Sequence, residues 1–257
     1  MCNLSSVTGS RLPDHAFQNQ KSASRHHTGQ ERRRVETCQP ADRLRKRISP
    51  AGAGALLLDA ATQAYDQMTQ DHVLTVARAL AGHRGIIDVV PGVNNLLVLF
   101  DAVTVEHAQV AALLDTLWEL PVASSLTGRE ITASVTYGGA FAEDLAMIAE
   151  AADLSIDATI ALHESGRYCV AAIGAMPGFA YLTGLDPRLI LPRRASPRLQ
   201  VERGAVIVGG SHASIMPCTA PTGWHILGHT DLILFDPDRA EACLLRPGDI
   251  VRFQRAQ

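Results

Sequence analysis

Short apolar segments recur at close spacing from Leu189 to the C-terminus, and glycine, proline or aspartate separates them. Such segments predict β-strands, and their spacing favours an antiparallel barrel or sandwich. The predicted strands are Leu199 to Val201, Ala205 to Val208, Ser214 to Met216, Trp224 to Leu227, Leu232 to Phe235 and Ile250 to Phe253. This rhythm of strands and turns constrains the fold more than any other feature of the chain.

An earlier region predicts a small α+β sandwich. Its order is strand, helix, strand, strand, helix, with a hairpin turn at Pro91-Gly92 and Thr104 as the N-cap of the second helix. The predicted strands are Ala55 to Leu58, Ile86 to Val90 and Leu96 to Phe100, and the first helix carries the stripe of Val73, Leu74, Ala77 and Leu80. A stretch rich in turn formers, 121–128, divides this region from the rest, so we predict domains at 48–125 and 126–257.

Residues 1–47 differ in kind, because arginines stand among Ser, Gln and His with almost no apolar residues. We expect a disordered basic extension without a secretory signal. It could touch nucleic acid, but an unstructured leader is the simpler interpretation. A net charge of -3 gives no case for nucleic-acid or membrane binding by the whole chain, and five scattered cysteines predict reduced thiols in the cytoplasm.

Between the two strand-rich regions, polar residues stand at helix starts and on a buried helix face. Asp144 stands where acids favour the start of a helix, and Ser155 is a predicted N-cap. His163 then falls on or beside the buried face of that helix. Two of these residues have two interpretations each. Asp144 is either a helix-dipole partner or a site residue, and His163 is either a hydrogen-bonded core residue or an acid, base or anion donor at a pocket.

Turn formers and unusual side chains gather between Gly174 and Thr230, where we place the active surface. Pro177-Gly178 fixes a turn, and the rings of Phe179 and Tyr181 fall on one face of the extended segment that follows. Pro221, Gly223 and Trp224 form a second turn that ends in a large flat side chain. Three guanidinium groups on a proline-braced segment could hold a carboxylate or phosphate; they belong to Arg193, Arg194 and Arg198. Core packing is the simpler interpretation of the aromatic residues.

Other chemistries find little support. The sequence has no Gly-rich phosphate loop and no G-x-S-x-G elbow. His225 and His229 have the spacing of a helical metal pair, but they stand in a strand-like stretch, so we predict no metal site.

Several short motifs in order resemble one family, called allophanate hydrolase subunit 1, which includes the B subunits of 5-oxoprolinases and a sporulation-kinase inhibitor. The resemblance covers residues 48–257. The motifs are VTYGGxFxxDL from Val135, PGFxYLxGL from Pro177, PRRAxPR from Pro192, GGxxxxI from Gly209, PxGW from Pro221, IxGxT from Ile226 and PGDxVRF from Pro247. Four short stretches depart from the usual pattern, at Ala142 to Leu145, Ala175, Arg203 to Val206 and Thr222, which suggests a changed substrate or a lost activity.

The resemblance implies a cyclophilin-like β-barrel after the first domain. It also implies a B-type component of an ATP-dependent 5-oxoprolinase, a hydrolase that opens 5-oxoproline to glutamate together with A- and C-type subunits. Half of a biotin-dependent carboxyltransferase and a histidine-kinase inhibitor are the alternatives. We expect His163, Arg194 and Asp144 to be catalytic. We expect Pro177, Gly178, Phe179, Tyr181, Arg193, Arg198 and Trp224 to bind substrate, with ATP as the cofactor of the assembled complex and biotin only under the alternative.

Overall fold

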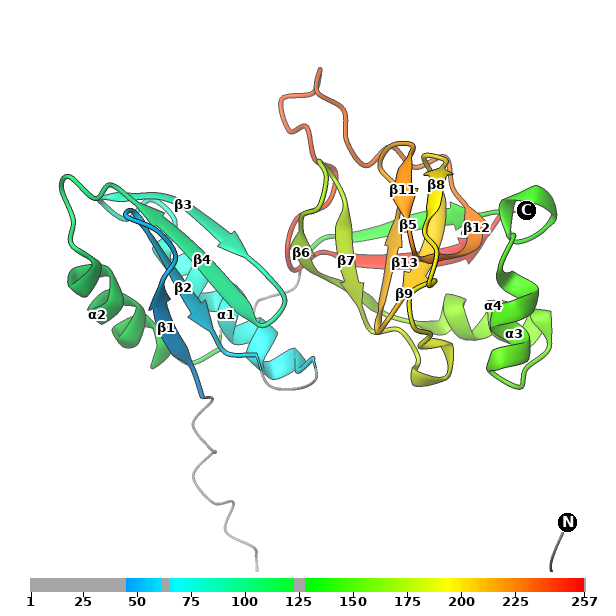
Figure 1. Ribbon diagram of the computed structural model, residues 1–257, viewed down its shortest axis with the longest axis horizontal. Helices are drawn as coiled ribbons and strands as arrows, with labels where there is room; N and C mark the ends of the chain where they lie inside the picture. Colours follow the sequence, from blue (N-terminus) through cyan, green and yellow to red (C-terminus); the bar gives the residue numbers. More distant parts are fainter. Residues whose placement is uncertain (1–44, 62–64, 123–127, 257) are drawn as a thin grey trace, which may run out of the picture. The chain divides into compact units, whose positions relative to one another are not determined.

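The computed structural model describes residues 45–61, 65–122 and 128–256 (Figure 1). The predicted basic extension at 1–47 lies almost wholly outside these residues, and so does the predicted boundary between 125 and 126. Strands of the described residues form one four-stranded sheet, one seven-stranded sheet and one two-stranded sheet.

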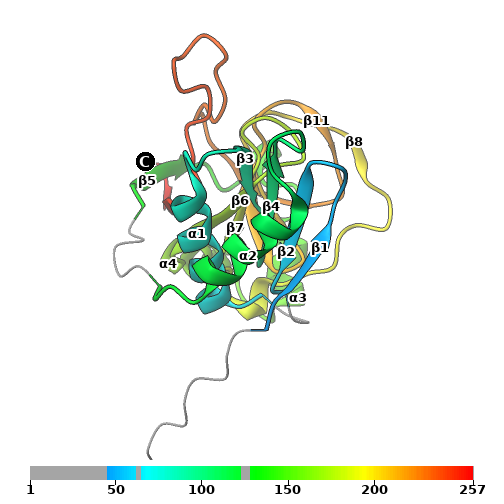
Figure 2. The same cartoon turned by 90° about the vertical axis from the view of Figure 1, so that its left-hand side faces the viewer.

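The four-stranded sheet is antiparallel, with the order β1-β2-β4-β3. Its strands are β1 (Arg47–Pro50), β2 (Ala55–Asp59), β3 (Ile86–Pro91) and β4 (Asn95–Phe100). The predicted hairpin is present between β3 and β4. The sequence prediction lacks β1, a half-buried edge strand that ends in proline and carries no apolar run. Alternate residues of β2 and β4 are buried, because both helices of this region pack on one face of the sheet (Figure 2).

Side chains define where the two helices begin. Helix α1 (Gln67–Leu80) starts after Asp66, whose carboxylate accepts a hydrogen bond from the Thr69 N–H at 2.7 Å. Helix α2 (His107–Trp118) starts after Glu106, whose N–H donates to the Gln109 side chain at 2.9 Å. The predicted N-cap, Thr104, is therefore wrong. Its hydroxyl is engaged in the preceding turn, where it donates to the carboxylate of Asp101 at 2.9 Å.

The seven-stranded sheet has the order β12-β9-β10-β7-β6-β13-β5. Its strands are β5 (Glu130–Val135), β6 (Tyr168–Ile173), β7 (Ala180–Thr183), β9 (Ala205–Gly209), β10 (His212–Ile215), β12 (His225–His229) and β13 (Ile250–Arg255). The two edge strands approach each other where β5 ends, since Thr136 and His229 exchange backbone hydrogen bonds of 2.8 and 3.1 Å. The sheet is thus a nearly closed barrel, which confirms the predicted fold class.

The barrel is mixed rather than purely antiparallel, because β5 and β13 run parallel in register from Glu130 with Ile250 to Val135 with Arg255. Beside it, β8 (Arg198–Val201) and β11 (Ala220–Thr222) form the two-stranded sheet. Five of the six predicted C-terminal strands are present. The sixth, Leu232 to Phe235, is wrong: this segment forms no strand, and only Phe235 forms an isolated bridge, to Cys243. The short strands β7 and β11 are absent from the prediction.

Two helices follow β5: α3 (Leu145–Ala151) and α4 (Ile156–Ser165). Ser155 caps α4 as predicted, since its hydroxyl accepts from the Ala158 N–H at 3.1 Å. Apolar residues of both helices join those of the barrel strands in one core, which includes Leu145, Ile148 and Ile160. In the part of the chain that the structure describes, every helix is too short or too polar to cross a membrane.

Candidate functional site

A tight turn before β7 sets the position of the first aromatic side chains. The Phe179 N–H donates to the carbonyl oxygen of Met176 at 3.1 Å, which closes the predicted turn around Pro177 and Gly178. Gly178 has φ of +78°, and a Cβ atom there would lie 2.8 Å from the Cβ of Phe235. Both facts require glycine. Pro177 and Gly178 therefore shape the backbone of the site.

Three aromatic rings meet beyond this turn. The Phe179 ring lies 5.1 Å from the Tyr181 ring and 5.6 Å from the Trp224 ring, and the Tyr181 and Trp224 rings are 6.0 Å apart. All three pairs are edge-to-face, a favoured geometry for aromatic side chains. The predicted placement of Phe179 and Tyr181 on one face is confirmed. Gly209 makes room for Trp224, since a Cβ atom at that glycine would lie 2.6 Å from the indole.

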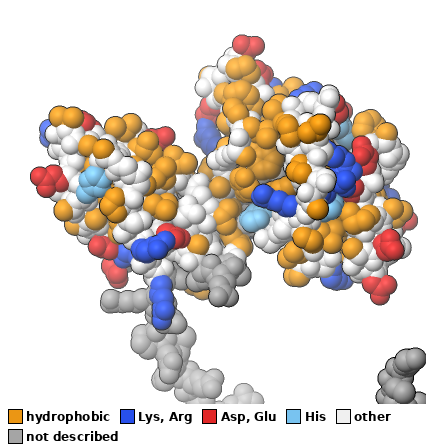
Figure 3. Space-filling model, viewed as in Figure 1, with side chains coloured by type: hydrophobic (Ala, Val, Ile, Leu, Met, Phe, Trp, Pro, Cys, Tyr) orange, Lys and Arg blue, Asp and Glu red, His pale blue; other side chains and the backbone are white. Residues whose placement is uncertain are grey.

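Arg193 covers the indole from outside. Its guanidinium carbon lies 5.6 Å from the centre of the Trp224 ring, a cation–π contact. Arg193 is exposed and forms no ion pair with any residue that the structure describes. Lysine or arginine side chains lie among hydrophobic ones on the face that carries β8, β9 and β11 (Figure 3). An unpaired guanidinium beside aromatic rings can receive an anionic group.

A cavity of about 390 Å³ lies at this place. It is lined by Ala175, Met176, Phe179, Tyr181, Arg193, Arg194, Pro197, Pro221, Thr222, Gly223 and Trp224, and we call it the aromatic pocket. Its volume suits a small molecule, and it combines apolar walls with few polar groups. The structure thus brings together Phe179, Tyr181, Trp224, Arg193 and Arg194, as the sequence analysis expected.

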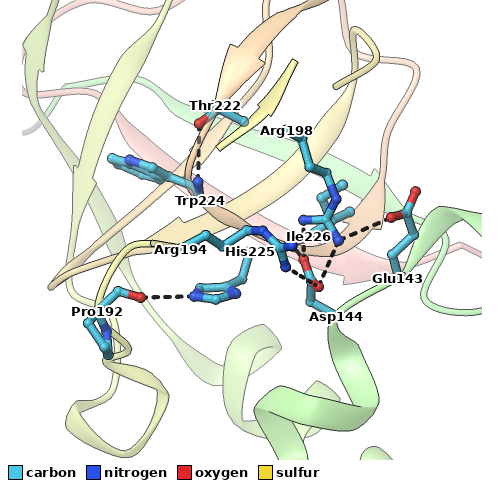
Figure 4. A network of polar contacts seen from close by, with 9 residues as sticks. All are labelled: Glu143, Asp144, Pro192, Arg194, Arg198, Thr222, Trp224, His225 and Ile226. Carbon is cyan, nitrogen blue, oxygen red and sulfur yellow. Dashed lines mark hydrogen bonds and ion pairs between the residues drawn. The ribbon is translucent and has the colours of Figure 1, made fainter. Parts of the chain in front are cut away.

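Arg198 does not line the aromatic pocket. It makes two hydrogen bonds to the carboxylate of Asp144, both of 2.8 Å, and an ion pair of 3.1 Å with Glu143. Arg194 also reaches Asp144, but by one contact of 3.4 Å. Figure 4 shows both guanidinium groups pointing toward Asp144 and away from the Trp224 indole. The predicted trio of arginines around one pocket is therefore corrected, because a buried carboxylate holds Arg198.

Asp144 is buried at the N-cap of α3, the predicted helix start, yet its side chain does not cap the helix. One carboxylate oxygen accepts the backbone N–H of Ile226 at 2.7 Å, so the carboxylate joins α3 to β12. Burial by itself would raise the pKa of Asp144. The hydrogen bonds from Arg198 and Ile226 and the charges of both arginines outweigh burial, so this pKa lies below its ordinary value. Asp144 is therefore ionised at neutral pH.

His163 lies in the barrel core. It is completely buried, its ring stacks on Phe253 at 4.5 Å, and its Nδ1 is 2.7 Å from the Tyr137 hydroxyl. Burial lowers the pKa of His163 to about 3. These contacts involve neither the residues that line the aromatic pocket nor Asp144. They match the interpretation of His163 as a hydrogen-bonded core residue. A catalytic role for His163 stays a prediction.

Sequence reasoning missed three polar neighbours of the site. Glu143 pairs with Arg198, and the adjacent acid at Asp144 was the signal that could have revealed it. The Nε2–H of His225 donates a hydrogen bond of 2.9 Å to the carbonyl oxygen of Pro192, and so supports the segment that carries the arginines. His212 lies against Tyr181, with ring centres 5.9 Å apart. Burial, and then the nearby charge of Arg193, lower the pKa of His212.

The dismissed metal pair occupies the two ends of β12. His229 binds the carbonyl oxygen of Arg203 at 3.0 Å, whereas His225 binds that of Pro192, so the two rings face different partners. Among the described residues, no group of three or more His, Cys, Asp or Glu side chains could hold a metal ion.

The barrel and its companion sheet define a carboxyltransferase type of fold. The solved structure of the Kluyveromyces lactis urea carboxylase is similar over 82% of this chain and 22% of that chain, with a TM-score of 0.66. The identity is 18%, so this likeness concerns the fold alone. A protein called TTHA0988 is similar with a TM-score of 0.69 and 34% identity over 79% of this chain and 40% of its own.

The family described as "Carboxyltransferase domain, subdomain C and D" matches residues 46–245, and the chain belongs to this family. The B subunit of the 5-oxoprolinase of Escherichia coli O157:H7 is 40% identical over 185 residues, which are 72% of this chain and 85% of that protein. The family predicted from the short motifs is thereby confirmed.

Proposed function

We propose that this chain is the B subunit of a 5-oxoprolinase, a complex that opens 5-oxoproline to glutamate with ATP. The observation that carries the proposal is the 40% identity to the B subunit of a 5-oxoprolinase over 85% of that protein. Under this proposal the chain acts in the cytoplasm as part of a hetero-oligomer, with A- and C-type subunits as partners. The hydrolase activity belongs to the assembled complex.

The aromatic pocket is the proposed substrate site. A 5-oxoproline molecule has a small ring and one carboxylate, and the pocket offers aromatic walls beside the guanidinium of Arg193. The ring would lie against Phe179, Tyr181 and Trp224, while the arginine holds the carboxylate by charge-assisted hydrogen bonds. Opening the ring breaks the bond between its carbonyl carbon and its nitrogen and adds water across it. Our assignment leaves ATP and the remaining catalytic groups to the complex.

Asp144 has a supporting role in this proposal. Its carboxylate is already engaged by Arg198, Arg194 and the Ile226 N–H, and it is ionised at neutral pH. It is poorly suited to transfer a proton, because a general acid or base works best with a pKa near the operating pH. We therefore treat Asp144 as a positioning residue that fixes the strand next to the pocket.

The carboxyltransferase alternative follows from the fold that the chain shares with urea carboxylase, in which biotin would carry the carboxylate. The kinase-inhibitor alternative would use the same surface as a docking site. Both are less well supported, because the relative with the 40% identity is named as a component of 5-oxoprolinase.

Reconstitution with the A- and C-type subunits tests the proposal. We expect ATP hydrolysis that depends on 5-oxoproline and yields glutamate, and we expect Arg193→Ala to lower kcat/KM by about tenfold or more, because one charge-assisted contact is lost. The control is Arg188→Ala, since Arg188 is exposed and pairs with Asp186 outside the pocket. A wild-type complex that consumes no ATP with 5-oxoproline, or that instead carboxylates urea with carboxybiotin, would refute the proposal.

A further inference from the structure

We infer that Arg194 is an exchangeable cation: it contacts Asp144 in this structure and turns to an anionic group, a carboxylate or phosphate, when one enters the aromatic pocket. Arg193 then provides the second guanidinium, and Arg198 stays on Asp144. The inference deepens the proposed function, on which it rests for the identity of the natural ligand, by assigning separate roles to the three arginines.

The two arginines hold Asp144 with unequal strength. Arg198 makes two bonds of 2.8 Å in the bidentate geometry that favours a guanidinium and a carboxylate, whereas Arg194 makes a single contact of 3.4 Å. In addition, the Nε of Arg194 is buried and has no hydrogen-bond partner among the described residues. A donor in this state gains a partner if its side chain rotates, and Arg194 is therefore the looser of the two.

Asp144 remains well paired when Arg194 leaves. Arg198 still occupies both carboxylate oxygens, and the Ile226 N–H still donates at 2.7 Å. Arg198 has in addition a second acid, Glu143, at 3.1 Å on the side away from Trp224 (Figure 4). Departure of Arg194 thus leaves Asp144 with its bidentate partner, whereas departure of Arg198 would leave it only the single 3.4 Å contact of Arg194 and the Ile226 N–H.

The backbone of Arg194 is already fixed at the pocket. Its N–H donates to the carbonyl oxygen of Gly223 at 2.7 Å, and both residues line the cavity. Only the side chain has to turn for the guanidinium to face inward. The neighbouring Arg193 lies on Trp224 without an ion pair to any described residue, so an anion between these two arginines would receive two cationic groups.

Anion binding to the isolated full-length chain tests this inference. The probes are 5-oxoproline, acetate and inorganic phosphate, titrated by calorimetry and followed by the Nε–H resonances of the arginines. We expect saturable binding of at least one probe, with a shift of the Arg194 resonance and little shift of the Arg198 resonance. Arg194→Gln should raise Kd by about tenfold or more and change Tm by less than about 3 °C.

Arg198→Lys should give the opposite pattern. It keeps the positive charge but loses the bidentate bonds to Asp144, so we expect Tm to fall by at least about 4 °C while Kd changes less than about threefold. The inference is overturned if the wild type binds none of the three anions, or if Arg194→Gln lowers Tm like Arg198→Lys and leaves Kd unchanged. If the Kd and Tm values follow the expected pattern but the reconstituted complex does not open 5-oxoproline, only the proposed function is refuted. An active complex with unchanged anion binding in Arg194→Gln would refute only this inference.

Discussion

Replacing Asp144 with alanine is expected to lower the free energy of unfolding by about 3 kcal/mol at pH 7, because removal of one member of a partly buried ion pair leaves Arg194 uncompensated and Arg198 with Glu143 alone. Two guanidinium groups, those of Arg194 and Arg198, lose the carboxylate that they share. The Ile226 N–H loses its acceptor as well, at a point where the register of β12 against β9 shifts. Urea unfolding of both proteins, followed by circular dichroism, measures this difference.

Asp157→Ala is the matched control. Asp157 also pairs with an arginine, Arg255, but the carboxylate is 86% exposed, so we expect a loss of less than about 1 kcal/mol. Lowering the pH adds a second test. Because the pKa of Asp144 is lowered in the folded chain, its ionic contribution is present above the ordinary value of 3.8 and is lost as the pH falls through the lower folded pKa. The difference in free energy of unfolding between the wild type and Asp144→Ala should therefore become smaller as the pH falls. Equal losses for both variants at pH 7 would contradict a central role for Asp144.

The site could be predicted from the sequence wherever local chemistry decided the structure. Pro177 and Gly178 predict a turn by their own backbone preferences, and the alternation of Phe179 and Tyr181 places both rings on one face. Five of the six C-terminal strands could be predicted for the same reason, since apolar runs between turn formers are a local signal.

Long-range pairing was beyond the reach of such reasoning. Three neighbouring arginines are equivalent in sequence, and what separates them is a carboxylate that stands 54 positions before Arg198. Only the folded barrel brings the start of α3 beside β8. Asp144 then contacts Arg198 and holds this arginine away from the aromatic pocket. The same limit explains the error at Leu232 to Phe235. That segment has the apolar character of a strand, but within it only Phe235 forms a β-bridge, an isolated one to Cys243.

His163 is expected to make the protein less stable in mild acid. Burial lowers the pKa of His163 from 6.5 to about 3. Between these pH values the histidine is therefore protonated in the unfolded chain and neutral in the folded chain. Stability therefore rises with pH in this window. At pH 5 the folded state should have lost about 2 kcal/mol from this histidine relative to pH 7.5, since each unit of pKa difference corresponds to about 1.4 kcal/mol.

Urea unfolding of wild type and His163→Gln at both pH values isolates this effect. For each protein, the free energy of unfolding at pH 5 is subtracted from that at pH 7.5. This difference should be smaller in His163→Gln than in the wild type by about 2 kcal/mol, whatever the absolute stability of the variant. His83→Gln, at an exposed histidine, should keep the full wild-type difference.

The result also decides between the two interpretations of His163. With a pKa far below neutrality and the Tyr137 hydroxyl 2.7 Å from Nδ1, the ring stays neutral and serves the core. A general acid or base needs a pKa near the working pH. The opposite outcome is that the His163 ring titrates near pH 6.5 by NMR and that both histidine variants show the same loss of stability between pH 7.5 and pH 5. The ring must then reach solvent, and this result would support the predicted catalytic role.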